Sequence, residues 1–349
     1  MNITEIIDPA LLEQMVTERF VNRKQHPTEP LIVWNYGKRA QYENTWNAAT
    51  TTCRGLITDT EGEIVARPFR KFFNLNQLSE IPAGPFRASA KMDGSLGVIY
   101  PGSDGYAVST RGSFTSDQAI WATAWLDANF DHQRAVRRAL NAGHTLLVEI
   151  IYPQNRIVVD YAGRADLTYL ATIDNATGQD VDNDHGWPGP HAATYDGLDL
   201  DAIMALDAPN TEGFVLRWED GTRAKVKFPE YLRLHKILTG VNERTIWEMM
   251  SNDHPLDELL ELVPDEFYTW VESTRGRLNV AFTTIADAAF DALATVPREA
   301  PRREQAEIIK QTPYPGLVFA LLDGKDARPM IWRLIRPDTT APFALDVDA

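Results

Sequence analysis

Residues 88–100 read ASAKMDGSLGVIY, and this stretch places Lys91 in a Lys-x-Asp-Gly frame just before an apolar strand. A polar turn from Lys91 to Gly94 leads into the apolar run LGVIY, which is typical of a buried β-strand. A lysine amine is a nucleophile only when it is deprotonated, and a glycine close by lets a ligand approach it. The same letters also fit a common Asp-Gly hairpin turn with an exposed lysine.

Similar short runs, rich in Val, Ile, Tyr and Phe and bounded by Gly, Asp or Pro, surround this stretch. Helical spacing instead marks residues 8–24 and 116–143, and it dominates after Gly240, where Asn242 is a candidate helix cap. We therefore expect an α+β fold with antiparallel sheets flanked by helices in residues 1–240, and an all-helical domain in 241–349. Strands are predicted at 31–36, 54–59, 62–69, 95–101, 106–112, 145–153, 156–161, 167–174, 213–220 and 223–228.

The segment TEGFVLRWEDGTRAKVKF, residues 211–228, predicts a β-hairpin with its turn at Asp220-Gly221. Lys225 and Lys227 are two residues apart on its second strand, so both should lie on one face, about 7 Å apart. Two ammonium groups on one face repel each other unless an anion lies between them, which favours a phosphate clamp. A solvated face of an edge strand would show the same spacing.

Four further charged residues interrupt apolar or aromatic segments. Glu149 lies within LLVEIIYP, where burial demands a partner such as a ribose hydroxyl, a lysine, a hydrated metal or a structural ion pair. Glu212 lies on the first arm of the 211–228 hairpin. Arg54 precedes a glycine, and Lys71 precedes two phenylalanines. Both settings suit a cation that contacts a phosphate or a base, and they equally suit a surface cation whose aliphatic chain packs on the protein.

The composition limits the class of protein. The chain has 349 residues, with 34 basic and 49 acidic side chains, and its net charge of −15 excludes a simple basic nucleic-acid-binding module. Residues 165–212 hold ten acidic residues and no Lys or Arg. Cys53 is the only cysteine, so no disulfide forms within the chain. We see no signal sequence and no apolar run long enough for a membrane span, and we expect a cytoplasmic protein that makes no membrane contact.

Seven ordered segments together resemble the phage RNA ligase 1 family, within the covalent nucleotidyltransferase superfamily. They are CRGLI, ARPFRKFFNLNQ, KMDGSLGVIY, STRGSFTSDQA, VEIIYPQNRIVVDY, TEGFVLRW and AKVKFPEYLRLH, and they run from about Tyr36 to His235. The resemblance implies an adenylyltransferase domain over 1–240. It also implies an ATP-dependent RNA ligase that uses ATP and Mg²⁺, with Mn²⁺ as a substitute, and that works through lysyl-AMP and adenylated RNA.

The resemblance also implies a role for each matching residue. Lys91 would attack the α-phosphate of ATP, and Glu212 would support the catalytic metal. Asp257 is a candidate second metal ligand from the helical tail, although the acidic run around it equally fits a solvated helix face. Arg111 departs from the family, which can carry lysine there, so a planar guanidinium replaces a compact ammonium group. The implied nucleotide-binding residues are Tyr36, Arg54, Lys71, Phe73, Asp93, Gly94, Arg111, Glu149, Lys225 and Lys227.

The expected partners are ATP and RNA ends, either single-stranded or in a broken loop such as a cleaved tRNA, bound by a monomer in RNA repair. A small positive pocket in an otherwise acidic surface predicts weak and selective RNA capture. The alternatives are a DNA ligase, a capping-type nucleotidyltransferase, and a non-catalytic RNA-end-binding relative. The tail shows no strand pattern for the OB barrel common in DNA ligases and capping enzymes.

Overall fold

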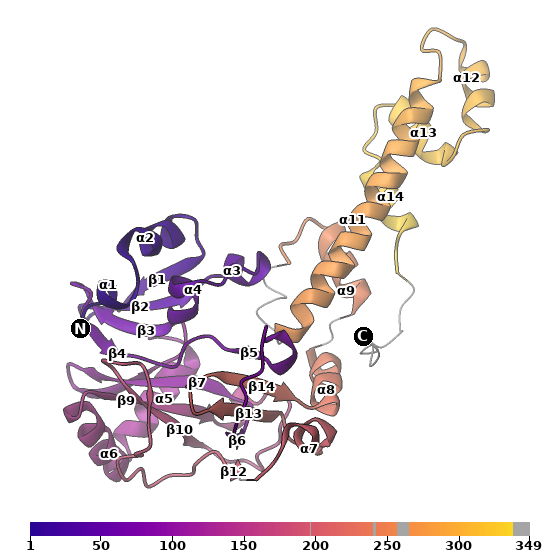
Figure 1. Cartoon of the computed structure of the whole chain (residues 1–349). Coiled ribbons are helices and arrows are strands. Elements are labelled where there is room, and N and C mark those ends of the chain that lie inside the picture. Colours follow the sequence, from indigo (N-terminus) through magenta and orange to yellow (C-terminus); the bar gives the residue numbers. More distant parts are fainter. Residues whose placement is uncertain (196, 240–241, 257–264, 338–349) are drawn as a thin grey trace. The chain divides into compact units, whose positions relative to one another are not determined.

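The computed structural model describes every residue except 196, 240–241, 257–264 and 338–349 (Figure 1). The chain divides into two compact units, Met1–His235 and Lys236–Ala349. The first unit contains all the β-strands of the described residues, arranged in three sheets. The functional domain assignment, an adenylyltransferase domain followed by a helical domain, stays a prediction.

The first sheet is antiparallel and has the strand order β1-β2-β3-β4. Its short helices cover apolar side chains such as Ile7, Leu12 and Leu56. The helix predicted at 8–24 is wrong beyond Thr17, because the following residues pair with β2 as an edge strand. The elements of this part are α1 (Ile3–Ile6), α2 (Pro9–Thr17), β1 (Val21–Gln25), β2 (Leu31–Tyr36), α3 (Lys38–Tyr42), α4 (Ala48–Thr52), β3 (Arg54–Asp59) and β4 (Ile64–Ala66).

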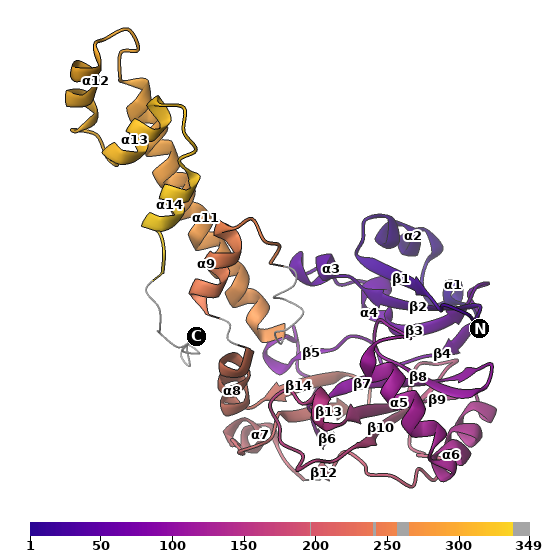
Figure 2. The same ribbon diagram turned by 180° about the vertical axis from the view of Figure 1, so that it is seen from behind.

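The second sheet has the order β11-β10-β9-β7-β8, with α5 and α6 packed on one face (Figure 2). The apolar run of β9 is long because both faces of this strand are buried. Leu146 and Val148 pack under these helices, whereas Leu147 packs with Val33 of the first sheet. The elements are β7 (Ser95–Gly102), β8 (Gly105–Ser109), α5 (Asp117–Asp127), α6 (Phe130–Asn141), β9 (His144–Ile151), β10 (Asp166–Asp174) and β11 (Asp180–Val181).

The third sheet has the order β12-β6-β13-β14-β5 and contains the predicted hairpin as β13 and β14. All its strand pairs are antiparallel except β14 with β5, which run parallel. The elements are β5 (Phe73–Asn74), a 3₁₀ turn (Leu75–Gln77), β6 (Phe86–Ala90), β12 (Thr194–Tyr195), α7 (Leu200–Ala205), β13 (Gly213–Trp218), β14 (Arg223–Lys227) and α8 (Pro229–Thr239).

One predicted strand is wrong. Residues 156–161 form no strand, although RIVVDY has a strand-like composition; they follow a 3₁₀ turn at Pro153–Asn155. The backbone N–H groups of Val158 and Val159 donate instead to one carboxylate oxygen of Asp93. A side chain therefore satisfies the donors that a neighbouring strand would otherwise accept.

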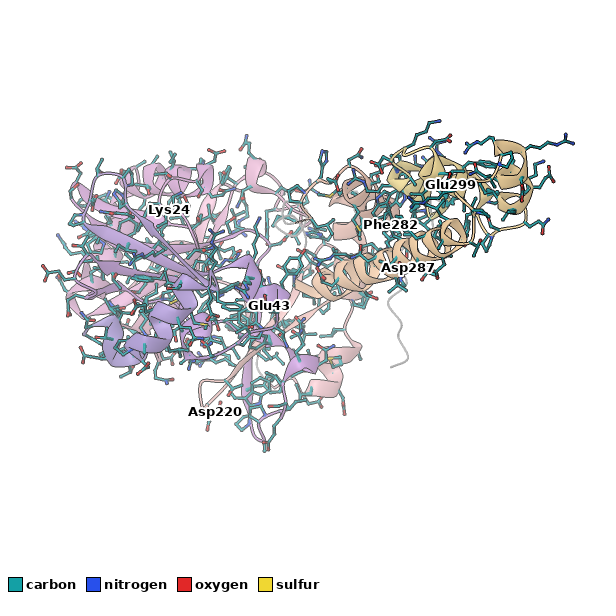
Figure 3. All side chains as sticks on the ribbon, turned by 90° about the horizontal axis from the view of Figure 1, so that it is seen from above. Lys24, Glu43, Asp220, Phe282, Asp287 and Glu299 are labelled. Atoms are coloured by element: carbon teal, nitrogen blue, oxygen red, sulfur yellow. The ribbon has the colours of Figure 1, made fainter. Side chains whose placement is uncertain are left out.

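Helices are the regular elements of the second unit in its described residues. Asn242 caps α9 as predicted, with its side chain accepting the backbone N–H of Thr245. Phe282 and Asp287 lie on the 30-residue helix α11, and Glu299 lies in the turn that follows it (Figure 3). No described helix is long and apolar enough to cross a membrane. The helices are α9 (Glu243–Ser251), α11 (Asp265–Ala294), α12 (Arg302–Ile309), α13 (Pro315–Leu322) and α14 (Arg328–Leu334).

Candidate active site

Two of the predicted site lysines stand in one row across the third sheet. The backbone N–H of Lys91, just past the end of β6, donates to the carbonyl of Gly213 at 2.8 Å, and Gly213 pairs with Lys227 on β14. Gly213 has a φ of +143°, and a Cβ there would lie 1.9 Å from the carbonyl oxygen of Val226. Only glycine fits at this position between the two lysines, because the neighbouring strand occupies the place of a side chain.

Glu212 joins the two lysines. Its Oε1 atom lies 2.7 Å from Lys91 Nζ and 3.2 Å from Lys227 Nζ. The Glu212 side chain is 3% exposed, whereas that of Lys91 is 22% exposed, so the carboxylate is buried and the lysine still reaches solvent. One carboxylate oxygen thus holds two ammonium groups, and only one of them lies at the surface of the site.

The register brings Lys225 to the same sheet face. Val215 pairs with Lys225 on one side and with Ser89 on the other, two residues from the row of Lys91 and Lys227. Because side chains alternate between faces along a strand, all three lysines lie on one side of the third sheet. The predicted shared face of Lys225 and Lys227 is confirmed, and Lys91 joins it from a third strand.

The loop after Lys91 is held by its aspartate. Asp93 is buried, and its Oδ1 accepts the hydroxyl of Tyr231 at 2.8 Å, while Oδ2 accepts the two N–H groups of 158–159. Burial raises the pKa of Asp93, the charge of Glu212 adds to this, and the backbone bonds oppose it. Asp93 therefore anchors the turn that carries the nucleophile candidate, and its predicted contact with the nucleotide stays a prediction.

Glu149 on β9 reaches the same turn from the second sheet. Its Oε1 accepts the backbone N–H of Gly94 at 3.0 Å. Burial raises the pKa of Glu149 to about 8, Lys91 opposes the shift, and Glu212 adds to it. A Cβ at Gly94 would lie 2.6 Å from the carbonyl oxygen of Ile150, so only glycine lets the two sheets come this close.

A second group of predicted residues gathers around Tyr36 at the end of β2. Arg111 Nη1 donates to the Tyr36 hydroxyl at 2.6 Å, and its guanidinium lies 4.8 Å from the ring centroid. A Cβ at Gly55 would lie 3.3 Å from Arg111 Cα, so Arg111 packs against the residue that follows Arg54. The guanidinium of Arg54 lies 5.1 Å from the ring centroid of Phe69.

Lys71 lies among three aromatic rings. Its Nζ is 5.6 Å from the ring centroid of Tyr36, 5.2 Å from that of Trp46 and 5.4 Å from that of Phe73. Phe73 then enters β5, where Asn74 pairs with Lys225. The strand pair therefore links this aromatic group to the sheet face that carries Lys91, Lys225 and Lys227, which we call the lysine row.

Sequence reasoning missed some members of these groups. Tyr231 and Trp46 were not predicted, although the available signals were an aromatic residue four positions after Lys227 and another nine positions after the WNYG motif. The structure brings together all the predicted residues of the first unit in the two connected groups. Asp257 lies outside the described residues.

Glu212 also offers an oxygen to a divalent cation. Glu212 Oε2 is buried and has no hydrogen-bond partner among the described residues. Such an orphaned carboxylate oxygen fits a Mg²⁺ ligand, either directly or through water. The described residues contain no cluster of three or more His, Cys, Asp or Glu side chains placed to hold a metal. Water and phosphate oxygens would therefore complete the coordination, as is usual for Mg²⁺.

Comparison with known proteins gives matches to RNA ligases. Residues 52–185 match the sequence model of a family described as RNA ligase. A putative bifunctional polynucleotide kinase/RNA ligase of Autographa californica nuclear polyhedrosis virus is 26% identical over 272 residues, which cover 70% of this chain and 39% of that protein. A putative RNA ligase of Thermovibrio ammonificans is 27% identical over 227 residues, covering 58% of this chain and 59% of that protein.

Among solved structures, a mutant Naegleria gruberi RNA ligase with ATP and Mn matches at 21% identity and a TM-score of 0.35. The match covers 43% of this chain and 51% of that chain. In each of these comparisons the chain spans less than two thirds of its relative's length. The matched segment 52–185 contains Lys91, Arg111 and Glu149. The resemblance of this chain to the phage RNA ligase 1 family, which the ordered sequence motifs indicate, is thereby confirmed.

Proposed function

We propose that the protein is an ATP-dependent RNA ligase that joins RNA 5′-phosphate and 3′-hydroxyl ends through lysyl-AMP and adenylated RNA. The contact of Lys91 and Lys227 with one oxygen of the buried Glu212 carries this proposal. It gives a partly exposed nucleophile, a second cation for the phosphate and a carboxylate whose other oxygen is available for a cation. The match of residues 52–185 to RNA ligases supports it.

The first step forms a bond between Lys91 Nζ and the α-phosphorus of ATP, and the bond to the pyrophosphate leaving group breaks. Lys91 must first lose a proton, and Glu212 Oε1, 2.7 Å away, is in hydrogen-bond contact to accept it. Lys225 and Lys227, on the same sheet face, would stabilise the charge that develops on the α-phosphate. A bound Mg²⁺ would neutralise phosphate charge beside Glu212.

In the second step an oxygen of the RNA 5′-phosphate attacks the phosphorus of lysyl-AMP, which frees Lys91 and gives adenylated RNA. In the third step the 3′-hydroxyl attacks the RNA 5′-phosphorus, a phosphodiester forms, and AMP leaves. Arg54, Lys71 and Arg111 are the cations proposed to hold the phosphates that flank the reacting one. The substrate we propose is a broken RNA, such as a cleaved loop in RNA repair, taken by a monomer.

The test is covalent labelling with ATP that carries the label on the α-phosphate. The protein with Mg²⁺ should keep the label after denaturation, and Lys91→Ala should lose it. Lys24→Ala, at an exposed lysine of β1, is the matched control and should label like the wild type. A wild type that keeps no label, or a Lys91→Ala variant that labels equally well, would contradict the proposal.

A competition assay separates the alternative functions. Single-stranded RNA with a 5′-phosphate, nicked duplex DNA and GTP are offered together to the protein. Preferential sealing of the nick would indicate a DNA ligase, and labelling by GTP would indicate a capping-type enzyme. Binding of RNA without covalent AMP would indicate a non-catalytic relative.

A further inference from the structure

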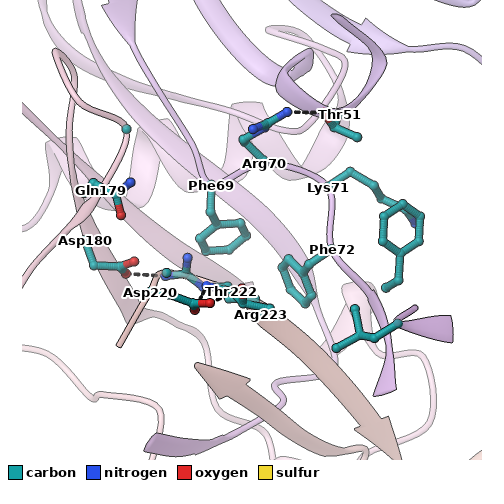
Figure 4. Close-up of a pocket in the computed structure, with 14 residues that line it drawn as sticks. Thr51, Phe69, Arg70, Lys71, Phe72, Gln179, Asp180, Asp220, Thr222 and Arg223 are labelled. Carbon is teal, nitrogen blue, oxygen red and sulfur yellow. Dashed lines mark hydrogen bonds and ion pairs between the residues drawn. The ribbon is translucent and has the colours of Figure 1, made fainter. Parts of the chain in front are cut away.

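A pocket of about 410 Å³ lies beside the aromatic segment 69–73 (Figure 4). Its other walls come from residues 178–180 and from the turn at 220–223 of the β13–β14 hairpin. Figure 3 labels Asp220 at the tip of this hairpin. The volume lies in the range of pockets that enclose small organic ligands, and one nucleotide falls within that class.

The pocket continues the sheet face that carries the lysine row. Arg223, one of its lining residues, is two residues before Lys225 on β14 and therefore points to the same face. One such repeat spans about 7 Å along a strand. Residues 69–73 lead into β5, which pairs with β14 at Lys225. A ligand in the pocket would thus lie next to the phosphates held by the lysines.

The charges divide the pocket into two ends. At one end, the carboxylate end, Asp180 is paired with both Arg223 and Arg217, and Asp220 adds a second carboxylate at the rim, so the two carboxylates balance the two guanidiniums. At the other end Arg70 donates to Thr51, and Lys71 lines the wall. The charge-balanced carboxylate end offers a triphosphate no net attraction, whereas the cationic end would attract a phosphate.

The lining chemistry suits a nucleobase at the carboxylate end. The rings of Phe69 and Phe72 meet edge to face at 70°, and the Phe69 ring already has the guanidinium of Arg223 near it. The Phe72 ring is therefore the aromatic surface of the pocket on which a base can stack, as bases of single-stranded RNA do on aromatic side chains. Gln179 and Asp220 offer amide and carboxylate groups that can hydrogen-bond the edge of a base. An uncharged planar group between these residues meets no unfavourable charge.

We infer that this pocket holds the terminal nucleoside of the RNA strand that carries the reacting 5′-phosphate. The base lies at the carboxylate end, and the phosphate points past Arg70 and Lys71 toward the lysine row. This inference rests on the proposed function, since it assigns the RNA subsite of the same reaction. It predicts that the pocket is needed for transfer of AMP to RNA and not for formation of lysyl-AMP.

Two variants that fill the pocket from its rim test the inference. Thr222→Trp and Gln179→Trp place a large ring in the volume without changing a residue of the lysine row. Glu219→Trp is the matched control, because Glu219 is an exposed residue of the same hairpin and does not line the pocket. The substrates are α-labelled ATP and a short 5′-phosphorylated oligoadenylate, made either intact or with an abasic 5′-terminal residue.

The rates of lysyl-AMP formation in both filling variants should stay within about twofold of the wild type. Transfer of AMP to the intact oligoadenylate should fall by about tenfold or more, which corresponds to the loss of one stacked base. The wild type should show a similar fall with the abasic strand, and the filling variants should no longer distinguish the two strands. Glu219→Trp should behave like the wild type.

Several results would overturn the inference. One is equal transfer by wild type and both filling variants, and another is a wild type that is indifferent to the abasic end. Loss of lysyl-AMP formation in both filling variants would assign the pocket to ATP instead. If the wild type itself forms no lysyl-AMP, the proposed function fails, and that outcome is distinct from all of these. The measured unfolding midpoint of each variant shows whether it is folded, and the abasic comparison needs no variant.

Discussion

Glu149→Gln should stabilise the protein in a pH-dependent way. Glu149 is 9% exposed, and its Oε1 accepts the N–H of Gly94 at 3.0 Å. A glutamine has nearly the same shape and can accept the same hydrogen bond through its own oxygen. The substitution therefore keeps the contact between β9 and the turn from Lys91 to Gly94. It removes only the ionisable carboxyl group of Glu149.

The magnitude follows from the pKa of Glu149, which burial raises from 4.5 to about 8. Between these values the folded protein keeps a proton that the unfolded chain has released, so stability falls as pH rises from 4.5 through 8. Each pKa unit corresponds to about 1.4 kcal/mol, so near pH 7.5 the loss is roughly 4 kcal/mol. The neutral glutamine avoids this loss at every pH.

The assay is urea unfolding of the wild type and Glu149→Gln at about pH 5 and about pH 7.5, without nucleotide. The free-energy difference between the two proteins should be small at the lower pH and reach roughly 4 kcal/mol in favour of the variant at the higher pH. Glu61→Gln, at an exposed turn, is the control and should show no such gain. A difference that does not change with pH would refute the reasoning.

Three further predictions concern the same unit. Tyr231→Phe removes the hydroxyl that donates to Asp93 Oδ1 at 2.8 Å, so urea unfolding should show a free energy of unfolding lower by about 1–3 kcal/mol. An unchanged midpoint would contradict the anchoring role. Gly94→Ala places a Cβ 2.6 Å from the Ile150 carbonyl oxygen, so thermal unfolding should show that the variant is less stable by about 1–3 kcal/mol. Burial raises the pKa of Cys53 to about 12, so iodoacetamide at neutral pH should label it only after unfolding, and rapid labelling of the native protein would oppose this.

Much of the site could be predicted because its parts are local in the chain. The hairpin with Asp220-Gly221 at its turn places Lys225 and Lys227 on one face by period-2 geometry alone. The apolar run around Glu149 predicted a buried carboxylate, and the structure shows it buried against the lysine loop. In each case the signal lies within a few residues of the side chain that it places.

The errors arise where a distant side chain or strand competes with local preference. Val158 and Val159 have strand-forming side chains, but Asp93 accepts their N–H groups from about 65 residues away in the chain. Residues 21–25 follow a helix in sequence and could extend its helical pattern. They nevertheless form strand β1, because they pair with β2. Local propensity is a weak preference, and tertiary hydrogen bonds override it.

The sequence by itself determined the order of the motifs, the α+β class and which charged residues lie within apolar strands. These features could be predicted because periodicity and turn type depend on residues that are neighbours in the chain. Only the tertiary structure decided that Lys91 and Lys227 share one oxygen of Glu212, and that the Asp93 carboxylate holds the loop through Tyr231 and residues 158–159. It also decided that Arg223 and Asp180, 43 residues apart, close a pocket beside the lysine row. These contacts depend on strand pairing between segments that are far apart in the chain, and pairing of that kind is set by the packing of whole sheets rather than by any local pattern.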